Sequence, residues 1–371
     1  MNNKIIIVAG TRPEIIKLAP VYHALNARGF ESLMVLTAQQ DELTRGLTEW
    51  FEVRNLFRCN ILSGNTLVEK LGEITRNLEA VILRIKPVGV VVQGDTTSAL
   101  AGAISSFYNH VAVIHVEAGL RCESVSLPFP EEANRRLISK ISHLNFAPTT
   151  QAQSNLISEG VDFKQIKVTG NTVVDALKFT LQKLDLLNKS KLVNSNLNVL
   201  VTVHRRESFG EPLLQICQAI NEISENSNIK ITWPIHTNPE VSNVISANIL
   251  IKDNVNLVSP LSYPEMVKKL TEVDLILTDS GGIQEEALAL GLPVLILRGE
   301  TERPELIESG LGKLVGSNRI EIVREFKDAI QNLGFRETIQ LNESVLGIGL
   351  ASQLIAESIQ HQLLENFKVA P

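Results

Sequence analysis

The chain has 371 residues, of which 44% are hydrophobic and 20% charged, a length and composition that predict roughly two globular domains. Its formal net charge of -6, without a long basic run, argues against a nucleic-acid surface. The apolar stretch in the N-terminal MNNKIIIVAGTRPE is too short for a signal peptide or a membrane span, so we expect a cytoplasmic protein without a membrane partner.

Short runs rich in Val and Ile alternate with helical patterns along the first half of the chain. The first run is KIIIVAG (4–10), and a helical pattern follows it, with Ile15, Leu18 and Leu25 on one face. The later runs that predict strands are SLMVLTA (32–38), VGVVVQGD (88–95), VAVIHVEAG (111–119), HLNFAPT (143–149) and IKVTGN (166–171). Apolar runs without alternation indicate parallel strands that helices cover on both faces.

The same rhythm restarts after the polar segment KLDLLNKSKLVNSNLN (183–198). Five further runs predict strands: VLVTVHR (199–205), IKITWPIHT (229–237), VNLVSPL (255–261), VDLILTDS (273–280) and PVLILRG (293–299). We therefore predict an α/β protein with two doubly wound, Rossmann-like domains, residues 1–172 and 173–352. The amphipathic segment at 353–367 predicts a terminal helix that packs back on the first domain.

Polar motifs fall where the predicted strands end. They are GTRPE, QGDTT, VEAGLR, VHRRE, PIHTNP and TDSGG. In parallel sheets ligands bind beyond the carboxyl ends of the strands. The sequence thus predicts one nucleotide-sized site in a cleft between the two domains.

The motif TDSGGIQEEALALG (278–291) predicts an anion site. Ser280, Gly281 and Gly282 form a tight turn before a helix, whose N-terminal N–H groups and dipole favour a phosphate. Glu286, further along that helix, could accept hydrogen bonds from ribose hydroxyls. An ordinary strand-to-helix turn with a serine N-cap explains the same residues equally well.

Positive side chains stand at other strand ends. Arg12 and Lys17 lie near the start of the first predicted helix, where the dipole disfavours them, so either an anionic ligand or a salt bridge to Glu14 is required. The predicted strand at 199–205 ends in the motif VHRRE. Its three neighbouring nitrogen donors, His204, Arg205 and Arg206, suit a phosphate.

Three carboxylates form the other half of the pattern. Asp95 and Glu117 each end an apolar run, where a charge is costly unless it is paired or functional. Helix capping by Asp95 and a salt bridge from Glu117 to Arg121 are the structural alternatives, and Glu131 also fits a helix start. Acids without metal-ligand spacing or a GxGxxG fingerprint predict proton transfer with neither metal nor redox cofactor.

Together these motifs resemble those of the non-hydrolysing UDP-N-acetylglucosamine 2-epimerases. The resemblance runs in order through GTRPEIIKLAPV, QGDTT, VEAGLR, PFPEEANR, VTGNTVVDAL, VHRRESFG, DSGGIQEEA and TERPE. It implies a fold like the GT-B glycosyltransferases, a homodimer, and no cofactor. It also implies reversible C2 inversion between UDP-GlcNAc and UDP-ManNAc through elimination and re-addition of UDP.

The resemblance also assigns roles to residues. The candidate catalytic residues are Asp95, Glu117, Glu131 and His204. The candidate substrate-binding residues are Arg12, Lys17, Arg135, His204, Ser280, Gly281, Gly282 and Glu286. A regulatory site for a second UDP-sugar would involve Gln39, Gln40, Arg206 and His236.

The chain departs from the family pattern in two places. TAQQ (37–40) replaces the usual TGQH, which affects the expected regulatory site, and Met266 stands where an aromatic side chain often stacks on uracil, with Tyr263 as a substitute. The alternatives are an epimerase of another UDP-linked acetamido sugar, a hydrolysing epimerase, a GT-B glycosyltransferase and a non-catalytic UDP-sugar sensor.

Overall fold

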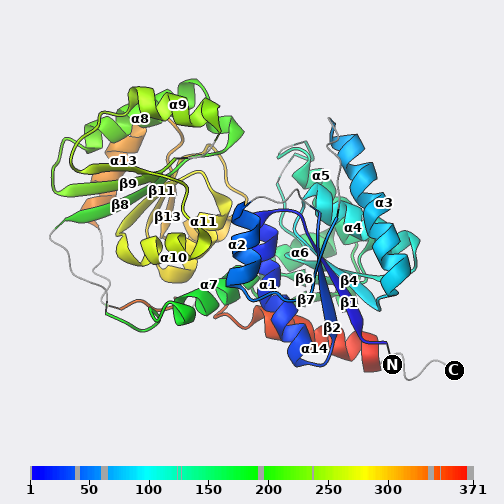
Figure 1. The fold of residues 1–371 in the computed structure, drawn as a ribbon. Coiled ribbons are helices and arrows are strands. Elements are labelled where there is room, and N and C mark those ends of the chain that lie inside the picture. Colours follow the sequence, from blue (N-terminus) through cyan, green and yellow to red (C-terminus); the bar gives the residue numbers. More distant parts are fainter. Residues whose placement is uncertain are drawn as a thin grey trace. The chain divides into compact units, whose positions relative to one another are not determined.

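The protein is described by a computed structural model that covers residues 2–37, 42–59, 66–122, 124–126, 128–190, 196–235, 238–332, 338–342 and 344–365, without the side chains of residues 42, 43, 206, 364 and 365. Contacts divide the chain into two compact units (Figure 1). The first contains Met1–Ala176 and Val345–Pro371, and the second contains Leu177–Ser344.

The first unit is built on a parallel sheet that, among the described residues, has seven strands in the order β3-β2-β1-β4-β5-β6-β7. The strands are β1 (Lys4–Ala9), β2 (Glu31–Leu36), β3 (Leu56–Arg58), β4 (Gly89–Gln93), β5 (Ala112–Val116), β6 (Leu144–Ala147) and β7 (Ile166–Val168). The helices are α1 (Arg12–Ala27), α2 (Glu42–Trp50), α3 (Leu67–Ile85), α4 (Thr97–Tyr108), α5 (Glu131–Ile141), α6 (Thr150–Ser158), η1 (Phe163–Gln165), α7 (Thr172–Lys183), which crosses into the second unit, α14 (Ala351–Gln360) and η3 (His361–Glu365).

The second unit repeats this plan with six described strands in the order β10-β9-β8-β11-β12-β13. The strands are β8 (Leu197–Thr202), β9 (Ile229–Pro234), β10 (Val255–Val258), β11 (Leu275–Thr278), β12 (Val294–Ile296) and β13 (Gly312–Leu314). The helical elements are η2 (Arg206–Ser208), α8 (Glu211–Ile223), α9 (Pro239–Asn248), α10 (Tyr263–Glu272), α11 (Gly281–Leu290), α12 (Pro304–Glu308) and α13 (Arg319–Gln331).

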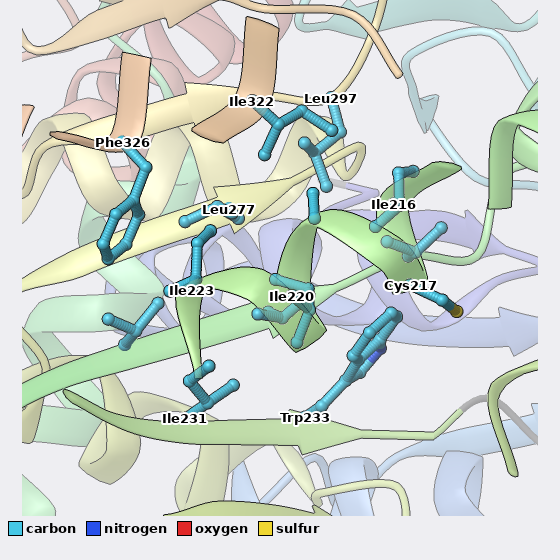
Figure 2. Packing of buried hydrophobic residues seen from close by; sticks show 14 of the residues in the cluster. Ile216, Cys217, Ile220, Ile223, Ile231, Trp233, Leu277, Leu297, Ile322 and Phe326 are labelled. Atoms are coloured by element: carbon cyan, nitrogen blue, oxygen red, sulfur yellow. The ribbon is translucent and has the colours of Figure 1, made fainter. Parts of the chain in front are cut away.

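Each sheet is covered by helices because its strands are apolar on both faces. Strand β4, for example, is buried at every position. In the second unit, Ile216, Ile220 and Ile223 of α8 belong to one buried cluster with Trp233 of β9 and Phe326 of α13 (Figure 2). These parallel, helix-covered sheets confirm the prediction of two doubly wound, Rossmann-like domains.

The C-terminal helix belongs to the first unit. Helix α14 packs on α1, and the guanidinium of Arg28 donates to the side chain of Gln360 over 2.9 Å. At the start of α14, Asp175 of α7 accepts from the backbone N–H of Ser352 at 2.9 Å. No helix of the described residues is both long and apolar enough to cross a membrane.

Candidate functional site

The strand order places the predicted site residues at the switch point of each sheet. In the first unit the order reverses between β1 and β4, and the turns that follow them carry Arg12 and Asp95. In the second unit it reverses between β8 and β11, and the following turns carry His204 and Ser280. Ligands of such sheets bind at these points, so sequence and topology select the same turns.

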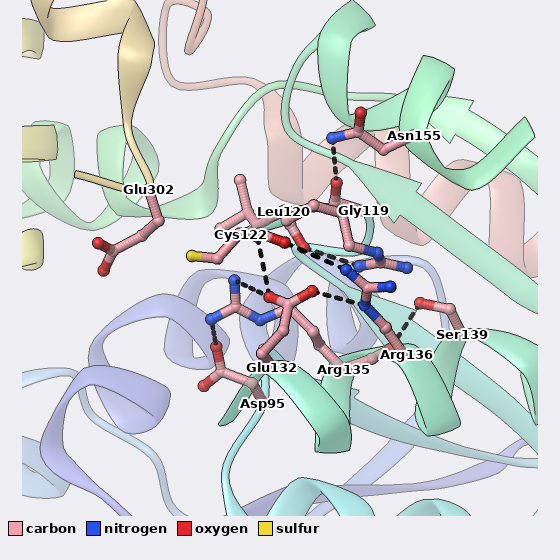
Figure 3. A network of polar contacts seen from close by, with 12 residues as sticks. Asp95, Gly119, Leu120, Cys122, Glu132, Arg135, Arg136, Ser139, Asn155 and Glu302 are labelled. Carbon is pink, nitrogen blue, oxygen red and sulfur yellow. Dashed lines mark hydrogen bonds and ion pairs between the residues drawn. The ribbon is translucent and has the colours of Figure 1, made fainter. Parts of the chain in front are cut away.

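Asp95 forms an ion pair with Arg135 of α5, as part of a network of charged side chains (Figure 3). Its carboxylate lies 2.5 Å from Nη2 of Arg135, whose Nη1 is 3.3 Å from Glu132. Helix α4 is capped instead by Thr96, which accepts from the backbone N–H of Ala99 at 3.0 Å, so Asp95 is not the cap. Nε of Arg135 is buried and has no hydrogen-bond partner among the described residues.

The charges of the partly buried Asp95 and the fully buried Glu132 determine the protonation state of Arg135. Burial disfavours the charged guanidinium, but these two carboxylates outweigh it and raise the pKa of Arg135. Arg135 is therefore a fixed cation beside one of the candidate acids.

Glu117 pairs with Lys17 rather than with Arg121. The Lys17 ammonium and the Glu117 carboxylate form a buried ion pair, while Arg121 binds Glu159 with two bonds of 2.8 Å each. Glu117 also has a φ of 62°, which a non-glycine residue adopts only at a cost. Such strain concentrates at functional sites, which supports a role for Glu117 beyond a structural salt bridge.

The two adjacent glutamates at the start of α5 have different environments. Glu132 is completely buried and accepts from the backbone N–H of Cys122 at 3.0 Å and from Nε of Arg136 at 2.7 Å (Figure 3). Glu131 is only partly buried, and among the described residues its carboxylate makes no hydrogen bond or ion pair. Glu131 is therefore available for chemistry, and Glu132 is committed to structure.

Glu14 is a second buried acid near the switch point of the first sheet. Its carboxyl accepts from the backbone N–H of Gly10 at 3.0 Å and from the hydroxyls of Thr11 and Thr96 at 2.7 Å each. Lys17 pairs instead with Glu117, so the suggested salt bridge between Lys17 and Glu14 is not formed among the described residues. Burial raises the pKa of Glu14 from 4.5 to about 7, against the smaller effect of these hydrogen bonds.

The raised pKa of Glu14 predicts a pH-dependent stability. The folded protein holds a proton that the unfolded chain releases at lower pH, so the stabilisation is complete below pH 4.5 and is lost as the pH rises through about 7. We expect this contribution to the free energy of unfolding to fall by about 3 kcal/mol across that window. Urea titrations at several pH values measure it. Glu14→Gln, which cannot titrate, should lose this slope, and an unchanged slope in the variant would contradict the assignment.

The turn after β11 leaves the N-terminus of α11 open to an anion. Ser280 occupies the N-cap position, but its side chain makes no capping hydrogen bond among the described residues. A Cβ on Gly281 would lie 2.6 Å from Nη1 of Arg303, whereas one on Gly282 would meet nothing within 4 Å. The helix start thus combines backbone N–H groups, a hydroxyl and a close guanidinium, as a phosphate site requires.

Asp279 ties the two turns of the second switch point together. It is fully buried and accepts from the backbone N–H groups of His204 at 3.0 Å and Arg205 at 2.9 Å, and from the hydroxyl of Ser208 at 2.8 Å. The His204 side chain stays 40% exposed, with Nδ1 3.4 Å from Asp279. The carboxylate therefore fixes the backbone of the His204 turn while leaving the imidazole accessible.

The motifs TERPE and VHRRE contain Glu302, Arg303 and Arg205 but do not show that these residues form a cluster. The buried carboxylate of Glu302 lies 2.7 Å from Arg298, 2.6 Å from Arg303 and 3.1 Å from Arg205. Burial raises the pKa of Glu302, but the three guanidiniums reverse this effect and hold it far below its usual range. Arg303 also binds Glu285 of α11 at 2.8 Å, so its guanidinium is fixed beside Gly281. The spacing of Arg298 and Glu302, four residues apart after a strand, is the available sequence signal.

Glu286 lies on the buried side of α11, next to Tyr263. Burial and the neighbouring Glu286 carboxylate raise the pKa of Tyr263 well above its ordinary value. Tyr263 and Glu286 are buried to the same degree, with exposed fractions of 4% and 5%. The expectation that Tyr263 replaces the missing stacking side chain stays a prediction.

The predicted regulatory residues lie almost entirely outside the described part of the chain. Gln39, Gln40 and His236 are not described, and only the backbone of Arg206 is, in η2. Within the described residues, no group of three His, Cys, Asp or Glu side chains could hold a metal ion.

Comparisons with known proteins agree on one family. A family model described as UDP-N-acetylglucosamine 2-epimerase matches residues 23–360. A Campylobacter jejuni protein named UDP-N-acetylglucosamine 2-epimerase is 38% identical over 370 residues, covering 96% of this chain and 97% of its own length.

Solved structures give the same result. The Neisseria meningitidis UDP-GlcNAc 2-epimerase bound to UDP-GlcNAc superposes with a TM-score of 0.89 at 38% identity, over 96% of this chain and 99% of that one. The S. aureus MnaA–UDP structure gives a TM-score of 0.87 at 37% identity, over 98% and 97% of the two chains.

Proposed function

Because the chain belongs to the UDP-N-acetylglucosamine 2-epimerase family, a family of isomerases, we propose that it interconverts UDP-GlcNAc and UDP-ManNAc. The observation that carries the proposal is the open start of α11, where the Ser280 hydroxyl and the exposed side of Gly282 face no competing partner in the described residues. This is a site for a diphosphate, and the candidate acids of the first unit supply the complementary proton chemistry.

The second unit binds the UDP group in this proposal. The diphosphate accepts hydrogen bonds from the N-terminus of α11 and from Ser280, and Arg303 and His204 add charge-assisted donors. Glu286, buried on α11, accepts from the ribose hydroxyls. Firm binding matters because UDP must remain in place after it leaves the sugar.

The first unit supplies the acid–base groups. A base removes the C2 proton while the C1–O bond breaks, and the electron pair of that bond leaves with the β-phosphate of UDP. The product is a 2-acetamidoglucal with a C1=C2 double bond. Re-addition of UDP at C1, with a proton delivered to the opposite face of C2, gives the epimer. Glu131, which makes no hydrogen bond or ion pair among the described residues, is the proposed proton-transfer group on one face of C2, and Asp95 or Glu117, each held in an ion pair, is the proposed group on the other face.

Incubation with UDP-GlcNAc in heavy water tests this reaction. We expect UDP-ManNAc that carries deuterium at C2, observed by NMR. Accumulation of free ManNAc with UDP would indicate the hydrolysing alternative instead. Exchange with a different UDP-linked acetamido sugar would change the substrate assignment, and binding without exchange would identify a sensor.

Gly281→Ala should weaken UDP binding. The added Cβ would lie 2.6 Å from Nη1 of Arg303, which Glu285 and Glu302 hold in place, so the guanidinium must leave its position. Loss of one charge-assisted contact predicts roughly tenfold weaker UDP affinity by calorimetry. Gly72→Ala, on α3 with open space around the new Cβ, is the control and should leave the affinity unchanged. Equal affinities for all three proteins would remove Arg303 from the site.

We also propose a homodimer that supplies ManNAc units for surface polysaccharides. The dimer is supported by the family resemblance and by apolar side chains that α3 and α4 leave in solvent, among them Val68 at 79% and Tyr108 at 77% exposure. Light scattering of the purified chain tests the dimer.

A further inference from the structure

Glu14 has the sequence position of an ordinary helix cap. It is the third residue of α1, and Thr11 is the N-cap, so the two have the T-x-x-E spacing of a capping box. Helix α3 of the same unit shows such a box in its usual form. There Thr66 and Glu69 accept from each other's backbone N–H at 3.2 and 3.0 Å, and both are exposed.

Glu14 differs from Glu69 in both burial and reach. It is 1% exposed, and its carboxyl leaves its own helix to bind the hydroxyl of Thr96, which caps α4. Its other oxygen binds the turn after β1, through the Gly10 N–H and the Thr11 hydroxyl. One carboxyl thus joins the two turns that flank the switch point of the first sheet.

The two joined turns also touch each other directly. A Cβ on Gly10 would lie 2.0 Å from Oγ of Ser98, so only glycine allows this approach. Arg12 begins the helix after one turn, and Asp95 immediately precedes Thr96 in the other. The Glu14 carboxyl therefore fixes the backbone positions of both candidate site residues, Arg12 and Asp95.

We propose that Glu14 is a positioning residue, which holds the Arg12 turn and the Asp95 turn in one rigid frame for the reaction of the sugar nucleotide. This inference rests on the proposed function. Burying a carboxyl costs free energy, and the exposed Glu69 box caps a helix without that cost, so capping alone does not account for Glu14. The second unit has the same design, since buried Asp279 joins the turns after β8 and β11.

Glu14→Gln and Glu69→Gln form a matched pair for the test, because each replaces a glutamate at the same position of a helix. Glutamine offers one acceptor oxygen instead of two, so at least one of the three hydrogen bonds that the carboxyl accepts, from Gly10, Thr11 and Thr96, must change. We expect Glu14→Gln to lower kcat for epimerisation about 100-fold, with KM within about threefold, because misplacement of reacting groups affects turnover more than binding. Glu69→Gln should stay within about twofold of the parent.

Variants of Thr96 test the hydrogen bond between the Thr96 hydroxyl and the Glu14 carboxyl. Thr96→Ser keeps the hydroxyl and should keep kcat, whereas Thr96→Val should lose activity as Glu14→Gln does. The double variant Glu14→Gln/Thr96→Val should lose no more than either single variant, since both remove one interaction. Fully additive losses would overturn the proposal, as would a kcat for Glu14→Gln within twofold of the parent.

Amide hydrogen exchange separates this inference from the proposed function. Glu14→Gln should increase exchange at residues 95–98, and Glu69→Gln should not. If the parent protein converts no UDP-linked acetamido sugar, the proposed function fails, while the exchange comparison still decides whether Glu14 fixes the Asp95 turn. Unchanged protection at 95–98 would refute the positioning role.

Discussion

Glu131→Gln should abolish proton exchange at C2 of the sugar while leaving the affinity for UDP almost unchanged. The glutamine has the size of the glutamate but cannot take up or release the proton, and loss of a general acid or base typically costs about 10²–10⁴-fold in rate. Because Glu131 makes no interaction in the described structure, the substitution should not disturb neighbouring groups. Deuterium incorporation followed by NMR measures the rate, and calorimetry measures UDP binding.

An exposed glutamate on the same unit provides the control for Glu131. Glu79 lies on the solvent face of α3, so Glu79→Gln removes one negative charge without touching the candidate site. It should exchange deuterium at the parental rate. If Glu131→Gln retained exchange within about tenfold of the parent, Glu131 would not be the proton-transfer group, and Asp95 or Glu117 would be the next candidates.

The strands and the motifs at their ends could be predicted because parallel strands buried on both faces consist of continuous apolar runs. Strands β3 and β13 could not, since Leu56–Arg58 and Gly312–Leu314 mix apolar and polar residues and have no buried position, and so lack the apolar run that indicates the equally short β12. Helix α1 begins at Arg12, which the sequence placed near the start of the first predicted helix. Local chemistry therefore determined most of the elements, and the undetected strands are those whose side chains are not buried.

The partners of the candidate site residues were less accessible from sequence. Lys17 and Glu117 are 100 residues apart, and their pairing depends on the order in which β1, β4 and β5 lie in the sheet. The nearer candidates, Glu14 and Arg121, fit by spacing but bind elsewhere. A pattern of charges along the chain shows that pairing is needed, but the topology decides which charges meet.

The environment of Glu132 could not be predicted for the same reason. Its neighbours on the chain suggest a first-turn carboxylate, which is ordinarily exposed and worth little. In the structure it is completely buried, with Arg135 and Arg136 on its own helix and the backbone of Cys122 across from it. The fold thus gives two adjacent glutamates opposite roles.

Glu132→Gln should destabilise the first unit by about 3–5 kcal/mol, the usual cost of removing one partner from a buried ion pair. The variant leaves the buried Arg135 with less compensating charge, and Arg136 loses its bond of 2.7 Å. Glu131→Gln, one residue earlier, should change the free energy of unfolding by at most about 0.5 kcal/mol. Chemical denaturation of the two variants, with amide exchange in α5 to assign the loss to the first unit, makes the comparison.

The activities of Glu131→Gln and Glu132→Gln provide a second comparison of the two glutamates. At a temperature where Glu132→Gln remains folded, it should still exchange the C2 proton, because Glu131 is intact and Asp95 keeps its bond to Arg135. Stability and exchange should thus be lost in different variants. If Glu132→Gln were stable but inactive and Glu131→Gln unstable but active, the roles of the two glutamates would be reversed, and the proton-transfer group would be the buried one.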